Sequence, residues 1–310
     1  MRNVFFILIL LMTFLKVHST TNFEQVVEIT IGDNEDQIKV DNIIDTEFDF
    51  IIIDSTIFIL SVEFNQLKAY DLKGKYKYGI NLSEKIYRRI FKYKKYIILF
   101  DSKSTISVYD KFGDPNLFYN IDDDNLNPGR SFLYENYIFV AENTDNPIYN
   151  KISAFEIIEN ESTLEIKKLD KKNNTSPFYF GKDFLPLEKE HLNYLSDLEV
   201  NGFKEQSNKY VLFTIRESNK FLDPELYYLY LKDIKKFKSL GYFPEQSTGI
   251  VAGNRGRSYE IYGNKIYILG IICEDNSDNR KFIKIRISKL DITKLGDLPD
   301  NFLPFNKETY

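Results

Sequence analysis

The feature that most constrains the fold of this chain is an internal repeat with a period of roughly 40 residues. Residues 69–74 (AYDLKG) match residues 108–113 (VYDKFG) at a separation of 39 positions. Residues 93–99 (YKKYIIL) match residues 134–140 (YENYIFV) without a gap, and residues 129–132 (GRSF) recur as residues 256–259 (GRSY). A repeat of this length is one supersecondary unit, and such units must stack on one another to bury their apolar faces.

Each unit contains short runs of Ile, Val, Phe and Tyr separated by polar turns rich in Asp, Asn, Gly and Lys. This alternation predicts four antiparallel strands in every unit, which is the pattern of a β-propeller blade. Five units begin near residues 44, 87, 129, 198 and 256. Residues 170–197 form an insertion or a degenerate unit, so five or six blades are expected. Within that insertion, helical spacing of apolar residues predicts one short helix over 185–198.

The two ends of the chain are expected to meet. Residues 26–31 (VVEITI) form a strand with no partner nearby, while the last unit lacks an outer strand of its own. An unpaired sheet edge invites aggregation. We therefore predict that the N-terminal strand completes the final blade and closes the propeller.

The first residues predict export. A basic Arg2 precedes an apolar run over residues 4–15, and small polar residues follow at residues 19–20. This order is typical of a secretory signal peptide, and the run is shorter than the roughly 20 residues that span a bilayer. We expect residues 1–19 to be a signal peptide and residues 20–310 a single propeller domain. The protein is then secreted or periplasmic and does not insert into a membrane after signal removal.

Composition excludes several classes of site. Without Arg2 and Lys16 the net charge of −5 becomes −7, which disfavours nucleic acid as a partner. The sequence contains two His and one Cys, and only His191 remains after signal removal. Metal sites with several His or Cys ligands are therefore not expected, and no catalytic residue or cofactor is predicted. Cys273 lies in an apolar run and is expected to be a buried structural thiol.

The candidate ligand-binding residues are Arg89, Arg130 and Arg257. The repeat places all three where a connection leads into the first strand of a unit. In a propeller these positions surround one mouth of the central channel, where several guanidiniums would favour a carboxylate, phosphate or acidic peptide. The alternative is that each Arg pairs with a nearby Asp or carbonyl and fixes blade packing. The matching positions near Phe50 and Phe203 are expected to be apolar, so that the set of arginines is incomplete.

Residues 96–101 (YIILFD) and 106–113 (ISVYDKFG) follow the order of apolar strand, polar turn and Tyr-Asp-x-x-Gly. In this respect the chain resembles exported NHL-type and TolB-type propellers, and the resemblance concerns architecture. We expect a binding or interaction module whose partner is an unknown protein or a small anionic ligand. Two alternatives remain open: a carboxylate-based enzyme of the glycoside hydrolase or lyase type at the same mouth, and a purely structural interaction protein.

Overall fold

The chain is nearly all β wherever its structure is described. The computed structural model describes residues 24–39, 48–80, 82, 86–101, 105–121, 125–142, 152–160, 163–169, 178–180, 186–188, 200–207, 210–216, 225–231, 236–242, 259–276 and 279–296. These ranges contain five four-stranded sheets and one two-stranded sheet, and their strands pair antiparallel. The predicted all-β class with repeated four-stranded sheets is therefore confirmed.

The four strands of a sheet follow one another along the chain. Sheet 1 consists of β2 (Phe48–Ile53), β3 (Thr56–Ser61), β4 (Gln66–Asp71) and β5 (Tyr76–Ile80). Sheet 2 consists of β6 (Tyr87–Tyr93), β7 (Tyr96–Asp101), β8 (Thr105–Tyr109) and β9 (Pro115–Asn120). Sheet 3 consists of β10 (Leu126–Tyr134), β11 (Tyr137–Glu142), β12 (Ile152–Asn160) and β13 (Thr163–Lys168).

The last two sheets repeat this arrangement with one exception. Sheet 4 consists of β16 (Val200–Ser207), β17 (Tyr210–Arg216), β18 (Glu225–Leu231) and β19 (Lys236–Tyr242). Sheet 5 consists of β20 (Tyr259–Tyr262), β21 (Lys265–Asn276), β22 (Asn279–Asp291) and the N-terminal strand β1 (Glu24–Thr30). The sheets begin close to the five positions at which the repeat predicted units.

The first hairpin of a sheet turns over two residues. The pairs Ile53–Thr56, Tyr93–Tyr96, Tyr134–Tyr137 and Tyr262–Lys265 close these hairpins. Residues with positive φ occupy the turns, including Asp54 at 46° and Gly263 at 61°. Such a turn has the twist that two antiparallel strands require. The matched segments 93–99 and 134–140 thus occupy the same register in sheets 2 and 3.

The repeated Tyr-Asp-x-x-Gly motif forms the turn between the third and fourth strands. The Asp71 carboxylate accepts hydrogen bonds from the backbone N–H groups of Lys73 and Lys75, at 2.8 and 2.9 Å. The Asp110 carboxylate accepts the equivalent bonds from Phe112 and Asp114, at 2.8 and 3.0 Å. An aspartate at this place satisfies two amides that no strand partner reaches. The motif is therefore conserved between the two units for a local reason.

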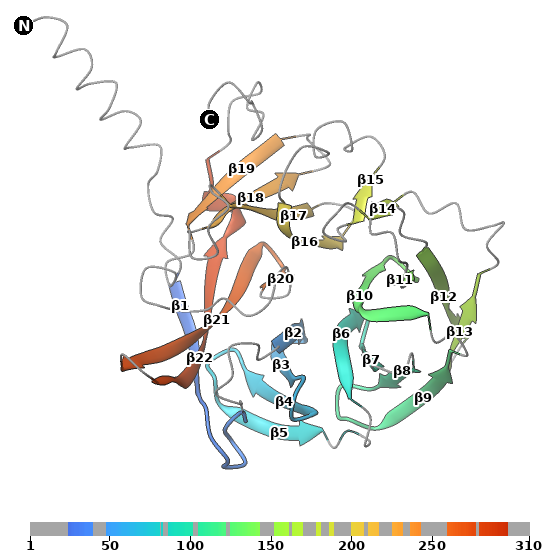
Figure 1. Ribbon diagram of the computed structural model, residues 1–310, viewed down its shortest axis with the longest axis horizontal. Helices are drawn as coiled ribbons and strands as arrows, with labels where there is room; N and C mark the ends of the chain where they lie inside the picture. Colours follow the sequence, from blue (N-terminus) through green and yellow to red (C-terminus); the bar gives the residue numbers. More distant parts are fainter. Residues whose placement is uncertain are drawn as a thin grey trace, which may run out of the picture.

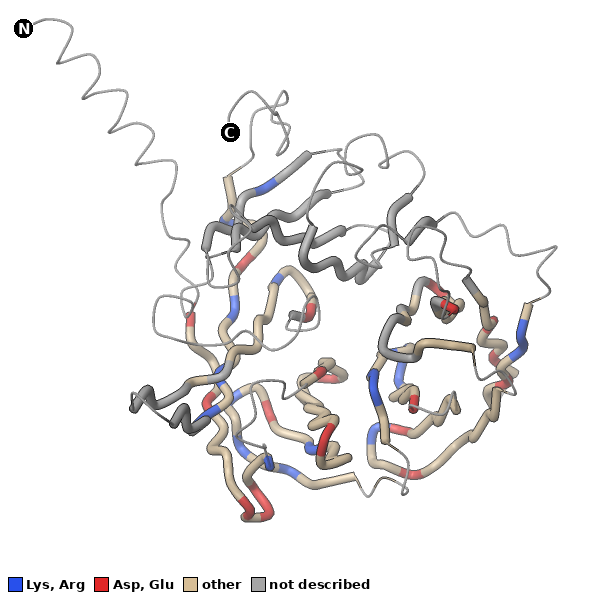
Figure 2. Tube along the Cα trace, viewed as in Figure 1, with Lys and Arg blue, Asp and Glu red and all other residues tan. Residues whose placement is uncertain are grey.

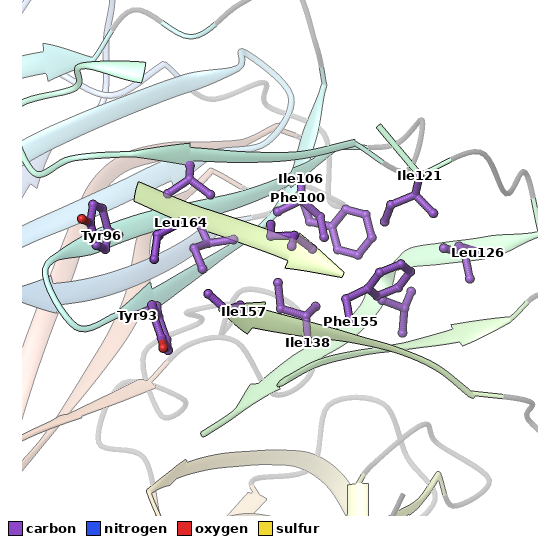
Figure 3. Packing of buried hydrophobic residues seen from close by; sticks show 14 residues of the cluster. Tyr93, Tyr96, Phe100, Ile106, Ile121, Leu126, Ile138, Phe155, Ile157 and Leu164 are labelled. Carbon is purple, nitrogen blue, oxygen red and sulfur yellow. The ribbon is translucent and has the colours of Figure 1, made fainter. Parts of the chain in front are cut away.

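Apolar side chains on both faces of a sheet pack against its neighbours. One cluster joins sheets 1 and 5, a second joins sheets 1 and 2, and a third joins sheets 2 and 3. Figure 3 shows the third cluster, in which Phe100 and Ile106 of sheet 2 meet Ile138 and Phe155 of sheet 3. Because successive residues of β2 face opposite sides, Phe50 and Ile52 belong to the first cluster and Ile51 and Ile53 to the second. These sheets are stacked face to face.

The first strands of the five sheets contact one another in a cycle. Strand β2 contacts β6, β6 contacts β10, β10 contacts β16, β16 contacts β20, and β20 contacts β2. Figure 1 shows the sheets arranged in chain order about this set of strands, with the fourth strands on the outside. The arrangement has two ends. At the strand-start end each first strand begins, and at the hairpin end it turns back into the second strand.

The N-terminal strand β1 pairs with β22, the last of the described strands, as the sequence predicted. In β1, Ile29 lies opposite Ile285 of β22 and Val27 lies opposite Ile287. The Glu28 carboxylate binds both Lys284, at 2.8 Å, and Arg286, at 2.9 Å, across the same pair of strands. Sheet 5 therefore acquires its fourth strand from the other end of the molecule.

Two turn glycines show that β1 takes the place of an outer strand. A Cβ added to Gly113 of sheet 2 would lie 2.9 Å from Ile80 of β5, the outer strand of sheet 1. A Cβ added to Gly74 of sheet 1 would lie 2.9 Å from Val27 of β1. Sheet 1 thus packs on β1 in the way that sheet 2 packs on β5.

The prediction of a helix over residues 185–198 is wrong at its start. Pro186–Glu188 forms strand β15, which pairs with β14 (Phe178–Phe180) as a two-stranded sheet. Pairing with Phe178, Tyr179 and Phe180 prevails there over the helical spacing of the leucines. The remaining residues of the predicted helix, 185 and 189–198, lie outside the described residues.

Candidate functional site

The candidate site lies at the strand-start end, where Arg89 and Arg130 stand in first strands that contact each other, β6 and β10. Arg89 lies four residues before Tyr93, the last residue of β6 before its hairpin turn. Arg130 lies four residues before Tyr134, the corresponding residue of β10. In β2, the residue that lies four positions before the corresponding residue, Ile53, is Asp49. The repeat therefore places Asp49, Arg89 and Arg130 at equivalent positions in three successive sheets.

Asp49 is a buried carboxylate that links sheet 1 to sheet 2. Its side chain is 3% exposed, and Oδ1 accepts a hydrogen bond of 3.0 Å from the backbone N–H of Phe50. Oδ2 accepts a hydrogen bond of 3.2 Å from the backbone N–H of Ile90 and lies 3.9 Å from Nη1 of Arg89. A buried carboxylate needs such partners to offset its desolvation. This geometry at Arg89 fits the alternative in which an arginine pairs with a nearby aspartate and fixes the packing of the blades.

Arg130 lies where strand β10 departs from regular pairing. The register of β10 on β11 shifts between Asn127 and Ser131, so Arg130 belongs to an irregular stretch of the strand. A similar shift occurs in β6 between Tyr87 and Arg89. Irregularities of this kind redirect side chains at the edge of a sheet. The side chain of Arg130 itself lies outside the described residues.

Arg257 does not share the register of the other two arginines. It lies outside the described residues, and it precedes the closing residue of its hairpin, Tyr262, by five positions instead of four. The position that matches Arg89 and Arg130 in this count is Ser258. The sequence match of residues 129–132 with residues 256–259 therefore differs by one residue from the alignment given by the hairpin turns.

Asp49 is the site residue that the sequence analysis missed, because the position near Phe50 was expected to be apolar. Asp49 is found by aligning the units on their first hairpin turn. The turn of sheet 1 is formed by Asp54 and Ser55, so Ile53 aligns with Tyr93 and Tyr134. An acidic residue, not an apolar one, therefore stands in sheet 1 where sheets 2 and 3 have arginine.

Two further buried acids stand at the ends of second strands on the same side. Asp101 is 1% exposed and accepts a hydrogen bond of 2.8 Å from the backbone N–H of Thr105. Glu142 is 9% exposed and accepts one of 3.0 Å from Oγ of Ser153. Asp101 lies opposite Tyr87 and Glu142 opposite Leu126, at matching places in sheets 2 and 3. Each carboxylate thus links the end of the second strand to the third strand of its own sheet.

His191, the one histidine left after signal removal, falls outside the described residues. Cys273 pairs with Phe282 in the β21–β22 hairpin, which confirms its place in a strand, and its side chain is not described. No group of three His, Cys, Asp or Glu residues suited to a metal occurs in the part of the chain that the structure describes. In that part, too, no helix is both long and apolar enough to cross a membrane. Figure 2 shows acidic and basic residues interspersed along the described strands.

Comparison with known proteins identifies no family. No family model matches the chain, and no curated protein matches it. Solved structures resemble it weakly: a DUF4221 member from Bacteroides vulgatus has a TM-score of 0.39 at 11% identity, covering 91% of this chain and 88% of that one. The computationally designed protein Ika8 has a TM-score of 0.38 at 7% identity, covering 86% and 100%. A chain of a nidogen–laminin complex has a TM-score of 0.33 at 12% identity, covering 81% and 78%.

Proposed function

We propose that this chain is an exported five-bladed β-propeller that acts as a binding module for an anionic ligand or an acidic segment of a partner protein. Residues 1–19 are its signal peptide, residues 20–310 are one propeller domain, and the mature protein is secreted or periplasmic. The cycle of contacts among the five first strands supports the ring. Five blades are favoured over six because the described residues of the region 170–197 form a two-stranded sheet, β14 and β15, of three residues each.

Closure of the propeller by β1 is part of the same proposal. The pairing of β1 with β22 gives sheet 5 four strands, and the contact of Gly74 with Val27 supports the packing of β1 on sheet 1. A ring in which every sheet has two neighbours leaves no sheet face exposed. This accounts for stability in a chain that cannot form an internal disulfide.

The ligand site is the strand-start end, and one observation carries it. Arg89 and Arg130 occupy equivalent positions in strands that contact each other, so the fold brings two guanidinium-bearing residues to the same place on neighbouring blades. Asp49 holds the backbone of β6 there and lies within ion-pair distance of Arg89, which restricts how that guanidinium is oriented. Oriented guanidiniums recognise carboxylate and phosphate well.

The carboxylate enzyme receives less support than binding. A glycoside hydrolase needs two carboxyl groups facing one substrate, about 5 to 10 Å apart. Asp49, Asp101 and Glu142 instead accept hydrogen bonds from the amides or hydroxyls of their own and adjacent strands. These hydrogen bonds show that Asp49 joins two sheets, whereas Asp101 and Glu142 join strands of one sheet.

A structural interaction protein remains the second candidate, because sheet 2 exposes two aromatic side chains. Phe112, in the β8–β9 turn, is 68% exposed and Phe118, on the outer strand β9, is 51% exposed. Exposed rings on one blade are a feature of protein contact surfaces.

Anion titration followed by thermal unfolding tests the proposed site. At constant ionic strength, phosphate and dicarboxylates should raise the Tm of the wild-type protein, since a ligand that binds only the folded state stabilises it. The increase should be smaller in the double variant Arg130→Ala/Arg257→Ala. The variant Lys73→Ala/Lys167→Ala, which removes the same charge from exposed positions, should respond like the wild type. An equal response of both variants, or no response of the wild type to any anion, contradicts the proposal.

A further inference from the structure

At the hairpin end, one position of the repeat departs from its pattern. The residue before the closing pair is Ile52 in sheet 1, Leu133 in sheet 3 and Ile261 in sheet 5, and each lies opposite an isoleucine of the second strand. In sheet 2 this residue is Lys92, opposite Ile97. Sheet 4 has a register shift at this point and is not comparable. Lys92 is half-buried, so a charge stands where three other sheets place an aliphatic side chain.

Lys92 reaches an aromatic ring from a sheet that is not its neighbour. Its ammonium nitrogen lies 5.3 Å from the centre of the Tyr262 ring, which belongs to the first strand of sheet 5. Sheet 1 lies between these two sheets in the cycle of first strands. The contact thus passes over the turn of the first hairpin of sheet 1. Three successive sheets therefore meet at this point.

Sheet 1 contributes polar groups to the same place. The Ser55 hydroxyl lies 3.4 Å from the Tyr262 hydroxyl, and the neighbouring Asp54 forms an ion pair of 2.7 Å with Lys111 of sheet 2. Lys92 is close enough to lower the pKa of Asp54 further, after the larger effect of Lys111. Asp54 is thus engaged by Lys111, and Lys92 forms no ion pair with another described residue.

We propose that Lys92, Tyr262 and Ser55 form a second binding site, at the hairpin end, for a small ligand that carries a carboxylate or phosphate group. The Lys92 ammonium supplies the charge, and the hydroxyls of Tyr262 and Ser55 supply donors from two other sheets. One of these two hydroxyls donates to the other, and the second proton points to the ligand. A charged residue at a position where the repeat places aliphatic ones costs stability, and such departures occur at sites of function. This site is separate from the arginines of the strand-start end.

The substitution Lys92→Leu tests the proposal without disturbing the fold, because Leu133 already occupies the equivalent position in sheet 3. The matched control is Lys95→Leu. Lys95 lies in the same hairpin, its ammonium lies 5.2 Å from the centre of the Tyr96 ring, and its loss changes the net charge equally. A third variant, Tyr262→Phe, keeps the ring and removes the hydroxyl.

The measurement is the dissociation constant of inorganic phosphate and of acetate, by calorimetric titration at fixed ionic strength. Lys92→Leu should weaken binding about tenfold or more, as expected for loss of a charge-assisted hydrogen bond. Tyr262→Phe should weaken it less, and Lys95→Leu should leave it unchanged. Lys92→Leu should also keep or raise the Tm without ligand, whereas a lysine that only holds the fold together would give a lower Tm.

Two results overturn this inference: unchanged affinity in Lys92→Leu, or equal loss in Lys92→Leu and Lys95→Leu. The variant Arg130→Ala/Arg257→Ala separates the two sites. If it abolishes all anion binding while Lys92→Leu does not, the hairpin-end site is refuted and the strand-start site stands. If it leaves the binding that depends on Lys92 intact, the hairpin-end site stands, and the strand-start site is refuted only if this variant loses no anion binding at all.

Discussion

The substitution Gly74→Ala examines the junction between sheet 1 and the N-terminal strand. Gly74 has a φ of +83°, which side chains of L-residues rarely adopt. A Cβ at this residue would lie 2.9 Å from Cγ1 of Val27, which is 1% exposed. The change therefore introduces backbone strain and a steric overlap with β1 together.

The expected cost is the sum of these two effects. A non-glycine residue in the left-handed region costs about 1–2 kcal/mol, and overfilling a packed interior costs about 1–3 kcal/mol. Gly74→Ala should thus destabilise the protein by about 2–5 kcal/mol. Gly263 has a φ of +61° with no atom within 4 Å of its added Cβ, so Gly263→Ala should cost only the first amount. Gly79→Ala lacks both effects and should be neutral or slightly stabilising.

A double-mutant cycle isolates the contact with β1. Val27→Ala removes the atom that the new Cβ meets, so Gly74→Ala in that background should cost about as much as Gly263→Ala. The coupling between the two sites should then equal the cost of the overlap, about 1–3 kcal/mol. Urea unfolding monitored by circular dichroism gives all four free energies, provided that the slope with denaturant is constant across the variants.

Additive effects of Gly74→Ala and Val27→Ala would refute the reasoning. They would mean that the turn of sheet 1 does not rest on β1, and that the N-terminal strand does not take the place of an outer strand. A cost of Gly74→Ala no larger than that of Gly263→Ala would lead to the same conclusion.

Glu28→Gln should cost about 1 kcal/mol at pH 7, less than a fully buried pair because the carboxylate is 25% exposed. The hydrogen bond from Lys284, with a further contribution from Arg286, lowers the pKa of Glu28, so its stabilisation is present above about pH 5 and is lost as the pH falls through the lowered value. Urea unfolding at several pH values should therefore show the two proteins converging in acid, and a constant difference would contradict this. Asp49→Ala should cost about 2–4 kcal/mol, because it leaves the amide of Ile90 buried without its acceptor. Asp114→Ala, at an exposed aspartate, should cost little in the same assay, and similar costs for both would show that Asp49 does not link the sheets.

The repeat predicted what is local in this fold. The Tyr-Asp-x-x-Gly turn was recognisable because Asp71 and Asp110 satisfy amides only a few residues away. Strand runs and two-residue turns are likewise set by neighbouring residues. The pairing of β1 with β22 was predictable for a different reason, since one unit lacked an outer strand and one strand lacked a sheet.

What could not be predicted depends on how the sheets face one another. The approach of Asp49 to Arg89, and that of Lys92 to Tyr262, joins residues of different sheets whose mutual orientation no sequence motif specifies. Arg257 was assigned to the position of Arg89 and Arg130 because the four-residue match of residues 129–132 with 256–259 was used for the alignment. The distance from the hairpin turn assigns Ser258 to that position instead. Apolar spacing over 185–198 predicted a helix at Pro186, where a partner strand decides the backbone instead.

The pairing of β1 with β22 also sets a delay during synthesis. Glu28 and its partner Lys284 are separated by 256 residues, which a ribosome adds in roughly 10 to 50 s. For that interval Val27 and Ile29 have no β22 to cover them, although the sheets that follow can already fold. In a crowded polysome the β22 of an older neighbouring chain is available first, so slow translation of the last unit favours exchange of β1 between two nascent copies.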